Sequence, residues 1–169
     1  MKILTFTLLL GCLLATQAFS QEQRHVIGAR TGLSTGITYE YKVDPFRGYK
    51  AMMGFREGGV QFTGMIQSYR PLYLKFTNKL YYYAGLGAHL GFTRFQPRHG
   101  LWANPFRFNY AYGHFAPVIG LDAILGIEYR LERAPIIFAL DAKPFFELFG
   151  QNIFRLSPFD IGLSIKFTF

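Results

Sequence analysis

The sequence predicts an all-β fold, an eight-stranded antiparallel up-and-down transmembrane β-barrel. In the final segment, 159–169, apolar and polar residues alternate with a period of two, as in a strand with one apolar and one polar face. Half of all residues are hydrophobic, and 19 Phe and 11 Tyr are among them. Yet no stretch after residue 20 is long and charge-free enough for a transmembrane helix, so sheet has to accommodate the apolar side chains.

The first 20 residues have the composition of a cleaved signal peptide. Lys2 precedes an apolar run, and small residues near Ser20 stand where a signal peptidase reads the chain. We therefore expect residues 1–20 to be removed and residues 21–169 to form the β-barrel domain. A retained N-terminal anchor is one alternative. Lipidation is another, because Cys12, the single cysteine, lies in a Leu-Leu-Gly-Cys stretch that resembles a lipoprotein processing site.

Four strands are predicted in the part of the chain that follows this leader. The first covers residues 25–33 and ends at a Ser-Thr-Gly turn. The second, 36–43, alternates Ile, Tyr, Tyr and Val with Thr, Glu and Lys, and it ends at Asp-Pro. The third, 49–56, sets Lys and Arg opposite Ala, Met and Phe and leads to Glu-Gly-Gly. The fourth starts at residue 60, runs to Tyr69 or beyond, and leads to Thr-Asn-Lys.

Four longer strands follow, and their two faces are easier to separate. In 80–95, one side carries Leu, Tyr and Ala and the other Tyr, Gly and His. In 115–131, an apolar side opposes Gly, Asp, Glu and Arg before a Glu-Arg-Ala turn. In 135–149, Phe, Leu and Ala oppose Asp, Lys and Glu before Gly-Gln-Asn, and 159–169 is the last strand.

The connections between these strands differ in length according to the end at which they lie. With both termini on the inner side of a membrane, the inner turns are 44–48, 77–79 and 132–134, and all are short. The outer loops include 96–114 and 150–158. Short inner turns and longer outer loops favour a transmembrane barrel.

Alternation alone leaves open which face points into the barrel. A soluble lipid-carrying barrel would hold the apolar face inside. Three observations favour the opposite arrangement: Tyr and Phe recur near the strand ends, the polar face is rich in glycine and mixed charge, and the apolar faces are too large for an eight-stranded interior. We therefore expect the apolar faces to contact lipid.

With these features, residues 21–169 resemble small bacterial outer-membrane β-barrel proteins, of the outer membrane protein A/X class and the outer membrane protein β-barrel domain family. The Tyr-Tyr-Tyr-Ala-Gly-Leu-Gly-Ala-His segment at 81–89 is similar to a central strand of such barrels. The resemblance implies export through the inner membrane, outer-membrane localisation in a Gram-negative envelope, and insertion by the barrel-assembly machinery. The assembly signal that it implies consists of Asp160, Gly162, Ile165, Phe167 and Phe169.

On this interpretation, the polar faces bring many charged side chains into a narrow interior. An eight-stranded barrel is just wide enough for its own side chains, and an isolated buried charge is costly, so neighbours of opposite sign are expected. A conduction path or a proton-linked site is the alternative. The predicted lumen charge network comprises Arg30, Glu40, Lys42, Lys50, Arg56, Asp122, Glu128, Arg130, Asp141, Lys143, Glu147 and Lys166.

Residue patterns that indicate catalysis, a cofactor or a metal are not found. His89 is predicted to face the interior, but no second histidine lies at ligand spacing. Serines after the leader stand neither in a Gly-x-Ser-x-Gly turn nor beside a histidine. We expect no enzyme activity, with a lipid-modifying enzyme as the less favoured alternative. The formal net charge of +8 comes from scattered positions, so nucleic acid is not an expected partner.

The function expected from the sequence is a structural or surface-interaction role for a monomeric barrel with a side-chain-filled interior. A narrow porin-like channel for small solutes is the alternative. The segment 96–114 interleaves aromatic residues with Arg98, Trp102 and Arg107, which suit contact with lipopolysaccharide phosphates or a surface partner. An ordinary loop whose aromatics rest at the membrane interface is the other interpretation. The expected partners are thus outer-membrane lipid and lipopolysaccharide.

Overall fold

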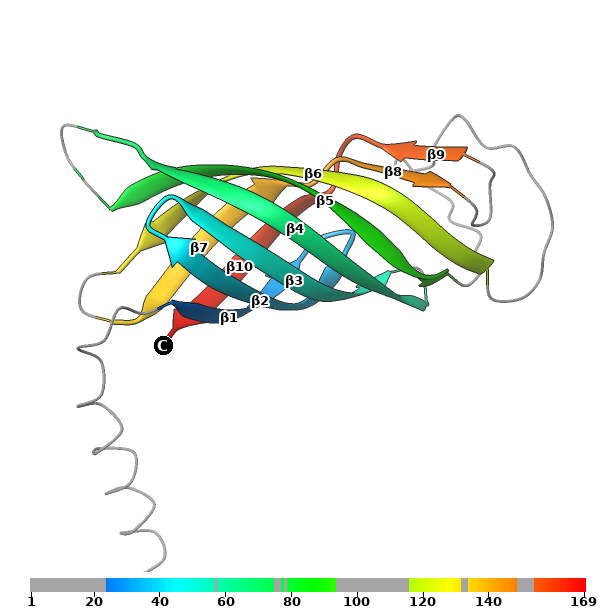
Figure 1. Ribbon diagram of the computed structural model, residues 1–169, viewed down its shortest axis with the longest axis horizontal. Coiled ribbons are helices and arrows are strands. Elements are labelled where there is room, and N and C mark those ends of the chain that lie inside the picture. Colours follow the sequence, from blue (N-terminus) through cyan, green and yellow to red (C-terminus); the bar gives the residue numbers. More distant parts are fainter. Residues whose placement is uncertain are drawn as a thin grey trace, which may run out of the picture.

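The computed structural model describes residues 24–56, 58–74, 77, 79–93, 116–131, 134–148 and 154–169. In these residues, strand segments form one closed antiparallel β-barrel of eight strands, which confirms the predicted fold class (Figure 1). No helix long and apolar enough to cross a membrane occurs among them. The predicted leader, 1–20, and the predicted loop, 96–114, lie outside the described residues.

The first half of the barrel is a meander of four strands, each paired with the next. Asp44 stabilises the second turn, because its Oδ1 accepts the Phe46 N–H at 2.7 Å and its Oδ2 accepts the Arg47 Nε–H at 3.0 Å. Gly58 in the third turn has φ 68°, a left-handed conformation that glycine adopts without steric cost. The four strands are β1 (His25–Thr31), β2 (Thr35–Asp44), β3 (Arg47–Arg56) and β4 (Gly59–Pro71).

The second half has two long strands followed by two interrupted ones. β7 and β8 both pair with β6, while β10 pairs with β7 and β9 with β8, so each of the last two barrel strands is broken once. Pro144 lies at the first break and Pro158 at the second, and proline cannot donate to a ladder. The segments are β5 (Leu80–Thr93), β6 (Ala116–Arg130), β7 (Ile136–Ala142), β8 (Phe145–Leu148), β9 (Phe154–Ser157) and β10 (Ile161–Thr168).

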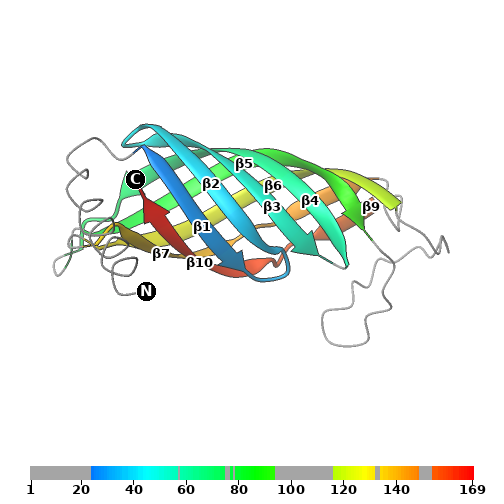
Figure 2. The same cartoon turned by 90° about the horizontal axis from the view of Figure 1, so that it is seen from below.

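The barrel closes where its first strand meets its last. β1 pairs with β10 over its whole length, and Figure 2 shows the two side by side near the C-terminus. At the end of this seam, the His25 N–H donates to the Phe169 carbonyl at 3.1 Å, and the Phe169 N–H donates to the His25 carbonyl at 2.8 Å.

Two connections differ from their predicted lengths. The outer loop expected at 150–158 contains strand β9, so the final barrel strand starts before the Pro158 break rather than after it. The inner turn expected at 77–79 is a longer connection between β4 and β5. In it, the Leu72 N–H donates to the Leu80 carbonyl at 2.8 Å, and Leu74 forms an isolated bridge with Thr77. Strand β9 was not predicted because it is short and ends next to a proline. The longer β4–β5 connection was not predicted because its local pairing has no regular alternation of apolar and polar residues.

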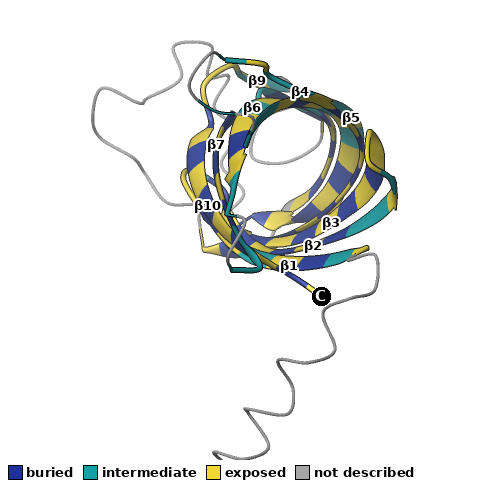
Figure 3. Cartoon of the chain, turned by 90° about the vertical axis from the view of Figure 1, so that its left-hand side faces the viewer, coloured by how far each residue is buried: buried dark blue, intermediate teal, exposed yellow. Residues whose placement is uncertain are grey.

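The two faces of the barrel wall have opposite chemistry. Figure 3, a view along the barrel, shows buried and exposed residues alternating around the ring of strands. Charged residues such as Arg30 (0% exposed) point inward, whereas apolar residues such as Leu86 (72%) and Ile66 (63%) point outward. A small apolar group shares the interior with the charges: Met65, Tyr69, Tyr83, Ile124 and Ala139.

Candidate functional site: the charged interior

Buried charge is the most unusual property of this interior, and it lies in three clusters. Six carboxylates are less than 4% exposed among the described residues, and each of them forms an ion pair. They are Glu40, Asp122, Glu128, Asp141, Glu147 and Asp160.

The terminal cluster lies near the end of the barrel at which the chain's C-terminus is found. Lys166 Nζ lies at its centre, 2.8 Å from Glu40 Oε1 and 3.2 Å from Glu128 Oε2. Lys50 Nζ approaches Glu40 at 3.3 Å, and Arg130 Nη2 approaches Glu128 at 2.6 Å. The members of this cluster are Glu40, Lys42, Lys50, Tyr69, Glu128, Arg130 and Lys166.

The central cluster is built around one guanidinium, that of Arg30. Its Nη2 lies 2.7 Å from Asp141 Oδ1, and its Nη1 lies 3.2 Å from Asp160 Oδ1. The Tyr83 hydroxyl donates to the other Asp141 oxygen at 2.9 Å. Asp160 also accepts the Leu33 N–H at 3.0 Å, so it joins the first turn to the start of β10. The central cluster therefore connects the two strands that close the barrel, β1 and β10, to β7.

The distal cluster lies toward the opposite end, where β3 finishes and β8 begins. His89 is held between two carboxylates, with Nδ1 2.6 Å from Asp122 Oδ2 and Nε2 3.1 Å from Glu147 Oε1. Lys143 Nζ contacts the second Asp122 oxygen at 2.9 Å. Arg56 pairs with Glu147, and its guanidinium lies 4.4 Å from the centroid of the Phe145 ring. The cluster consists of Arg56, His89, Asp122, Lys143, Phe145 and Glu147.

Glycine on the polar face makes room for the largest of these side chains. Gly120 pairs with His89, and a Cβ on Gly120 would lie 2.5 Å from the imidazole. A Cβ on Gly162 would lie 2.5 Å from the Arg30 guanidinium carbon. The Phe146 and Thr31 carbonyl oxygens would lie 2.2 and 2.5 Å from these two Cβ atoms. All these distances are shorter than van der Waals contact, so any side chain at either position would displace the neighbouring polar side chain or the adjacent backbone.

The structure brings the predicted lumen residues together in these clusters, and it adds others. Asp160 is a partner of Arg30, although the sequence interpretation treats it only as part of an assembly signal. Its place in the alternation of the last strand could have indicated an inward side chain. Tyr69 was also missed as a partner, and its hydroxyl donates to Glu40 Oε2 at 3.1 Å. Its inward position follows from the alternation of β4, but its contact with β2 does not.

The remaining sequence-predicted residues do not join the clusters. Gly162 faces inward beside Arg30, whereas Ile165, Phe167 and Phe169 are exposed on the outside of the barrel. Phe169 stacks on His25, with 5.7 Å between the ring centroids. Arg98, Trp102 and Arg107 lie outside the described residues.

Chemically, the clusters form a framework that joins strands across the barrel. Within the described part of the chain, no group of three or more His, Cys, Asp or Glu side chains could hold a metal ion. His89 is the residue best suited to acid–base chemistry, but it is 2% exposed and both of its ring nitrogens face carboxylates. The arrangement therefore gives every buried carboxylate among the described residues a cationic partner, and it ties β1 to β8 and β10 together.

Comparison with known proteins finds a similar fold at low sequence identity. No family model matches the chain, and no curated protein matches its sequence. Among solved structures, the crystal structure of the N-terminal β-barrel domain of Pseudomonas aeruginosa OprF is similar, with a TM-score of 0.51. The two chains are 12% identical, and the match covers 88% of this chain and 100% of that chain. At this low sequence identity, the comparison supports the fold alone.

Proposed function

We propose that this chain is an integral outer-membrane β-barrel of the small outer membrane protein A/X type, with a structural or surface-interaction role and an interior filled by its own side chains. The exposure of its apolar residues is the observation that carries the proposal. Leu86, Leu121 and Ile66 are each more than 60% exposed, and similar residues cover every strand from β1 to β6. An apolar surface this extensive indicates contact with lipid or a partner, because soluble monomers do not expose one.

The dimensions of the apolar surface fit a membrane. On β6, outward apolar residues run from Pro117 to Tyr129. At ~3.4 Å per residue, this is about 40 Å along the strand, and a tilt of about 40° reduces it to about 30 Å along the barrel axis. That height matches the hydrocarbon thickness of a bilayer, ~30 Å.

Aromatic residues gather at the end of the barrel where the termini lie. Tyr39, Tyr129, Phe167 and Phe169 are exposed there, and the Tyr39 hydroxyl lies 2.8 Å from His25 Nδ1. Rings with an apolar body and a polar tip are favoured at the boundary between lipid and water. This arrangement supports a girdle at the inner face of the membrane.

Burial of the interior charges supports a closed lumen rather than a channel. Lys143, Lys166 and Arg30 are no more than 1% exposed. An aqueous path wide enough for solutes would leave its lining side chains accessible to water. Within each cluster, side chains from different strands instead pair with one another, as expected for an interior filled by ion pairs.

The proposal includes an export route and partners. A leader at 1–20 would direct the chain through the inner membrane of a Gram-negative cell, and the barrel-assembly machinery would insert it as a monomer. We propose no catalytic role, because His89 is buried between carboxylates. For the surface-interaction role, Arg98 and Arg107 are the proposed contacts with lipopolysaccharide. If replacing both arginines with alanine left lipopolysaccharide binding unchanged, the proposal that they contact lipopolysaccharide would be wrong.

Membrane insertion is tested by fractionating cells that produce the full chain and floating their membranes on a density gradient. We expect the protein in the outer-membrane fraction, resistant to extraction by alkaline carbonate and released by detergent. Matched cells producing a soluble periplasmic protein serve as the control for leakage. Recovery of the chain in the periplasmic supernatant would contradict the proposal and revive a soluble lipid carrier.

A further inference from the structure

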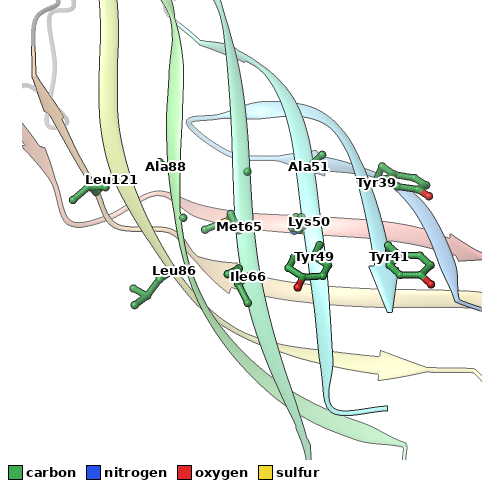
Figure 4. Close-up of a pocket in the computed structure, with 12 residues that line it drawn as sticks. Tyr39, Tyr41, Tyr49, Lys50, Ala51, Met65, Ile66, Leu86, Ala88 and Leu121 are labelled. Atoms are coloured by element: carbon green, nitrogen blue, oxygen red, sulfur yellow. The ribbon is translucent and has the colours of Figure 1, made fainter. Parts of the chain in front are cut away.

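The outward face of the barrel contains a groove that the proposed function does not use. It crosses β2 to β6 and has a volume of about 670 Å³, within the range of small-molecule sites (Figure 4). Its lining residues are Tyr39, Tyr41, Tyr49, Lys50, Ala51, Gly64, Met65, Ile66, Leu86, Gly87, Ala88 and Leu121.

The floor of the groove is low because three small residues lie in register on adjacent strands. Ala51 pairs with Gly64, and Gly64 pairs with Ala88. A Cβ added to Gly64 would meet no atom within 4 Å, so the space above it is open. Lys50 and Met65 line the groove with their backbones, since their side chains are buried inside the barrel.

The walls of the groove are apolar and aromatic. Ile66, Leu86 and Leu121 are 63%, 72% and 63% exposed, and they stand beside the floor on β4, β5 and β6. Tyr41 pairs with Tyr49, and Tyr49 pairs with Ile66, so the two tyrosines continue the wall formed by Ile66 and Leu86, as Figure 4 shows. A slender apolar chain would therefore contact this wall and the floor beside it.

Two arginines lie on the outer surface just beyond one end of the groove, outside its lining residues. The next outward pair beyond Tyr49 and Ile66 is Arg47 with Ser68, and Arg70 follows on β4. Arg47 is 77% exposed in its side chain and shares its charge with Asp44 at 3.0 Å. The Arg70 guanidinium lies 5.7 Å from the centroid of the Phe46 ring. Two guanidinium groups against one carboxylate leave this end positive.

We propose that the groove binds one anionic phospholipid, with an acyl chain over Gly64 and the phosphate between Arg47 and Arg70. The inference rests on the proposed membrane location, which places this end of the barrel at the inner interface. Guanidinium groups bind phosphate oxygens strongly, and basic residues at a membrane surface attract anionic headgroups. An apolar channel leading from a phosphate site fits a lipid better than it fits a soluble anion.

The site is tested by purifying the folded protein in detergent, adding phosphatidylglycerol or phosphatidylcholine, and counting retained lipids by native mass spectrometry. We expect wild type to retain one phosphatidylglycerol in preference to phosphatidylcholine. Gly64→Leu fills the groove without a clash and abolishes retention of both. Each of Arg47→Gln and Arg70→Gln lowers the phosphatidylglycerol preference about fivefold.

Matched controls separate the groove from the rest of the surface. Ala29→Leu adds the same side chain to the outward face of β1, and Arg24→Gln removes a cation outside the groove; both should retain lipid as wild type does. Equal lipid retention by Gly64→Leu and Ala29→Leu would overturn the lipid site. A wild-type dimer that Gly64→Leu abolishes would also overturn it, because the groove would then bind a second copy of the chain.

Membrane flotation of the same variants keeps the two proposals distinct. Variants that float normally but show no lipid preference contradict only the lipid site. A wild-type chain that fails to float contradicts the membrane location, and the lipid site with it.

Discussion

Glycines on the inner face are positioned to accept large polar neighbours. Gly120 faces His89, Gly126 faces Tyr83 and Gly162 lies against Arg30. Each pair places a residue without a side chain beside one that carries a charge or a hydroxyl. The clusters therefore depend on the spacing of small residues as much as on the charges themselves.

Gly120→Ala tests this steric role. The added methyl would lie 2.2 Å from the Phe146 carbonyl oxygen and 2.5 Å from the His89 ring, so the β6–β8 ladder or the imidazole has to shift. We expect the free energy of unfolding to fall by about 1–3 kcal/mol, measured by urea unfolding of the protein in lipid vesicles. Gly64→Ala, which adds the same methyl to open space, is the control and should unfold like wild type. Equal unfolding of both variants would argue against the steric role.

Asp141→Ala tests the ion pairs of the central cluster. It leaves the fully buried Arg30 guanidinium with Asp160 as the one remaining carboxylate partner among the described residues. Removing one partner of a buried pair typically costs about 3–5 kcal/mol, so a large fall in the urea midpoint is expected. Arg47→Gln breaks the exposed pair with Asp44 but keeps the Asp44 bond to the Phe46 N–H, so it should change the midpoint little. A wild-type midpoint for Asp141→Ala would contradict the structural role of the cluster.

The direction of each side chain is predictable from the sequence, but its partner is not. Strict alternation places Arg30, Asp141 and Asp160 on the inner face. Arg30 lies 111 residues from Asp141 and 130 from Asp160 along the chain, however. Which of them meet depends on the register of four strands and on how the barrel closes. Local patterns carry no information about that register.

At the scale of the elements, the last strand combines two roles that are easily confused. Asp160 and Gly162 have structural reasons for their identity, since one binds Arg30 and the other makes room for it. Phe169 contacts none of the interior clusters: it is 51% exposed on the outside, and its ring stacks on His25 and Phe167 at the end of the β1–β10 seam. Phe169 is therefore the residue with which an assembly signal can be tested separately from stability.

Phe169→Ser is predicted to impair insertion in cells more than refolding of the purified chain. We expect less folded protein in the outer membrane, measured by the gel mobility of unheated samples, while refolding into lipid vesicles stays near the wild-type rate. Phe159→Ser is the matched control, because Phe159 is an exposed aromatic that precedes β10 and lies outside the proposed signal. Equal insertion of the two variants would remove Phe169 from the signal.

The strands themselves were largely predictable, and the exceptions have physical causes. Alternation over 36–43 and 49–56 located β2 and β3 to within two residues at each end. The break at Pro144 was not foreseen, because the alternation keeps its phase across that proline. At Pro158 the phase reverses, from outward Leu156 to outward Ile161, and the short strand before that proline was taken for part of a loop. The ladder continues around the first break, where the Lys143 N–H donates to the Asp160 carbonyl at 2.8 Å. Such a contact depends on the neighbouring strand.

At the scale of the whole molecule, the inverted distribution of polarity connects the fold to the proposed function. Apolar side chains exposed outside favour lipid, and ion-paired side chains buried inside leave little room for water. Composition and girdle aromatics predicted the first property. The second required the structure, because the extent to which charges fill the interior depends on their mutual contacts.

The central claim is that the chain forms a membrane-inserted barrel with a closed interior. The conductance of the purified protein in a planar lipid bilayer tests this claim most directly. Insertion is first verified by flotation with vesicles of the same lipid, and a known open porin in the same bilayer verifies the sensitivity of the recording. With Arg30, Lys143 and Lys166 no more than 1% exposed, we predict no stable conductance steps above the bare bilayer. Reproducible, long-lived steps from the inserted protein would contradict the closed interior and favour a channel.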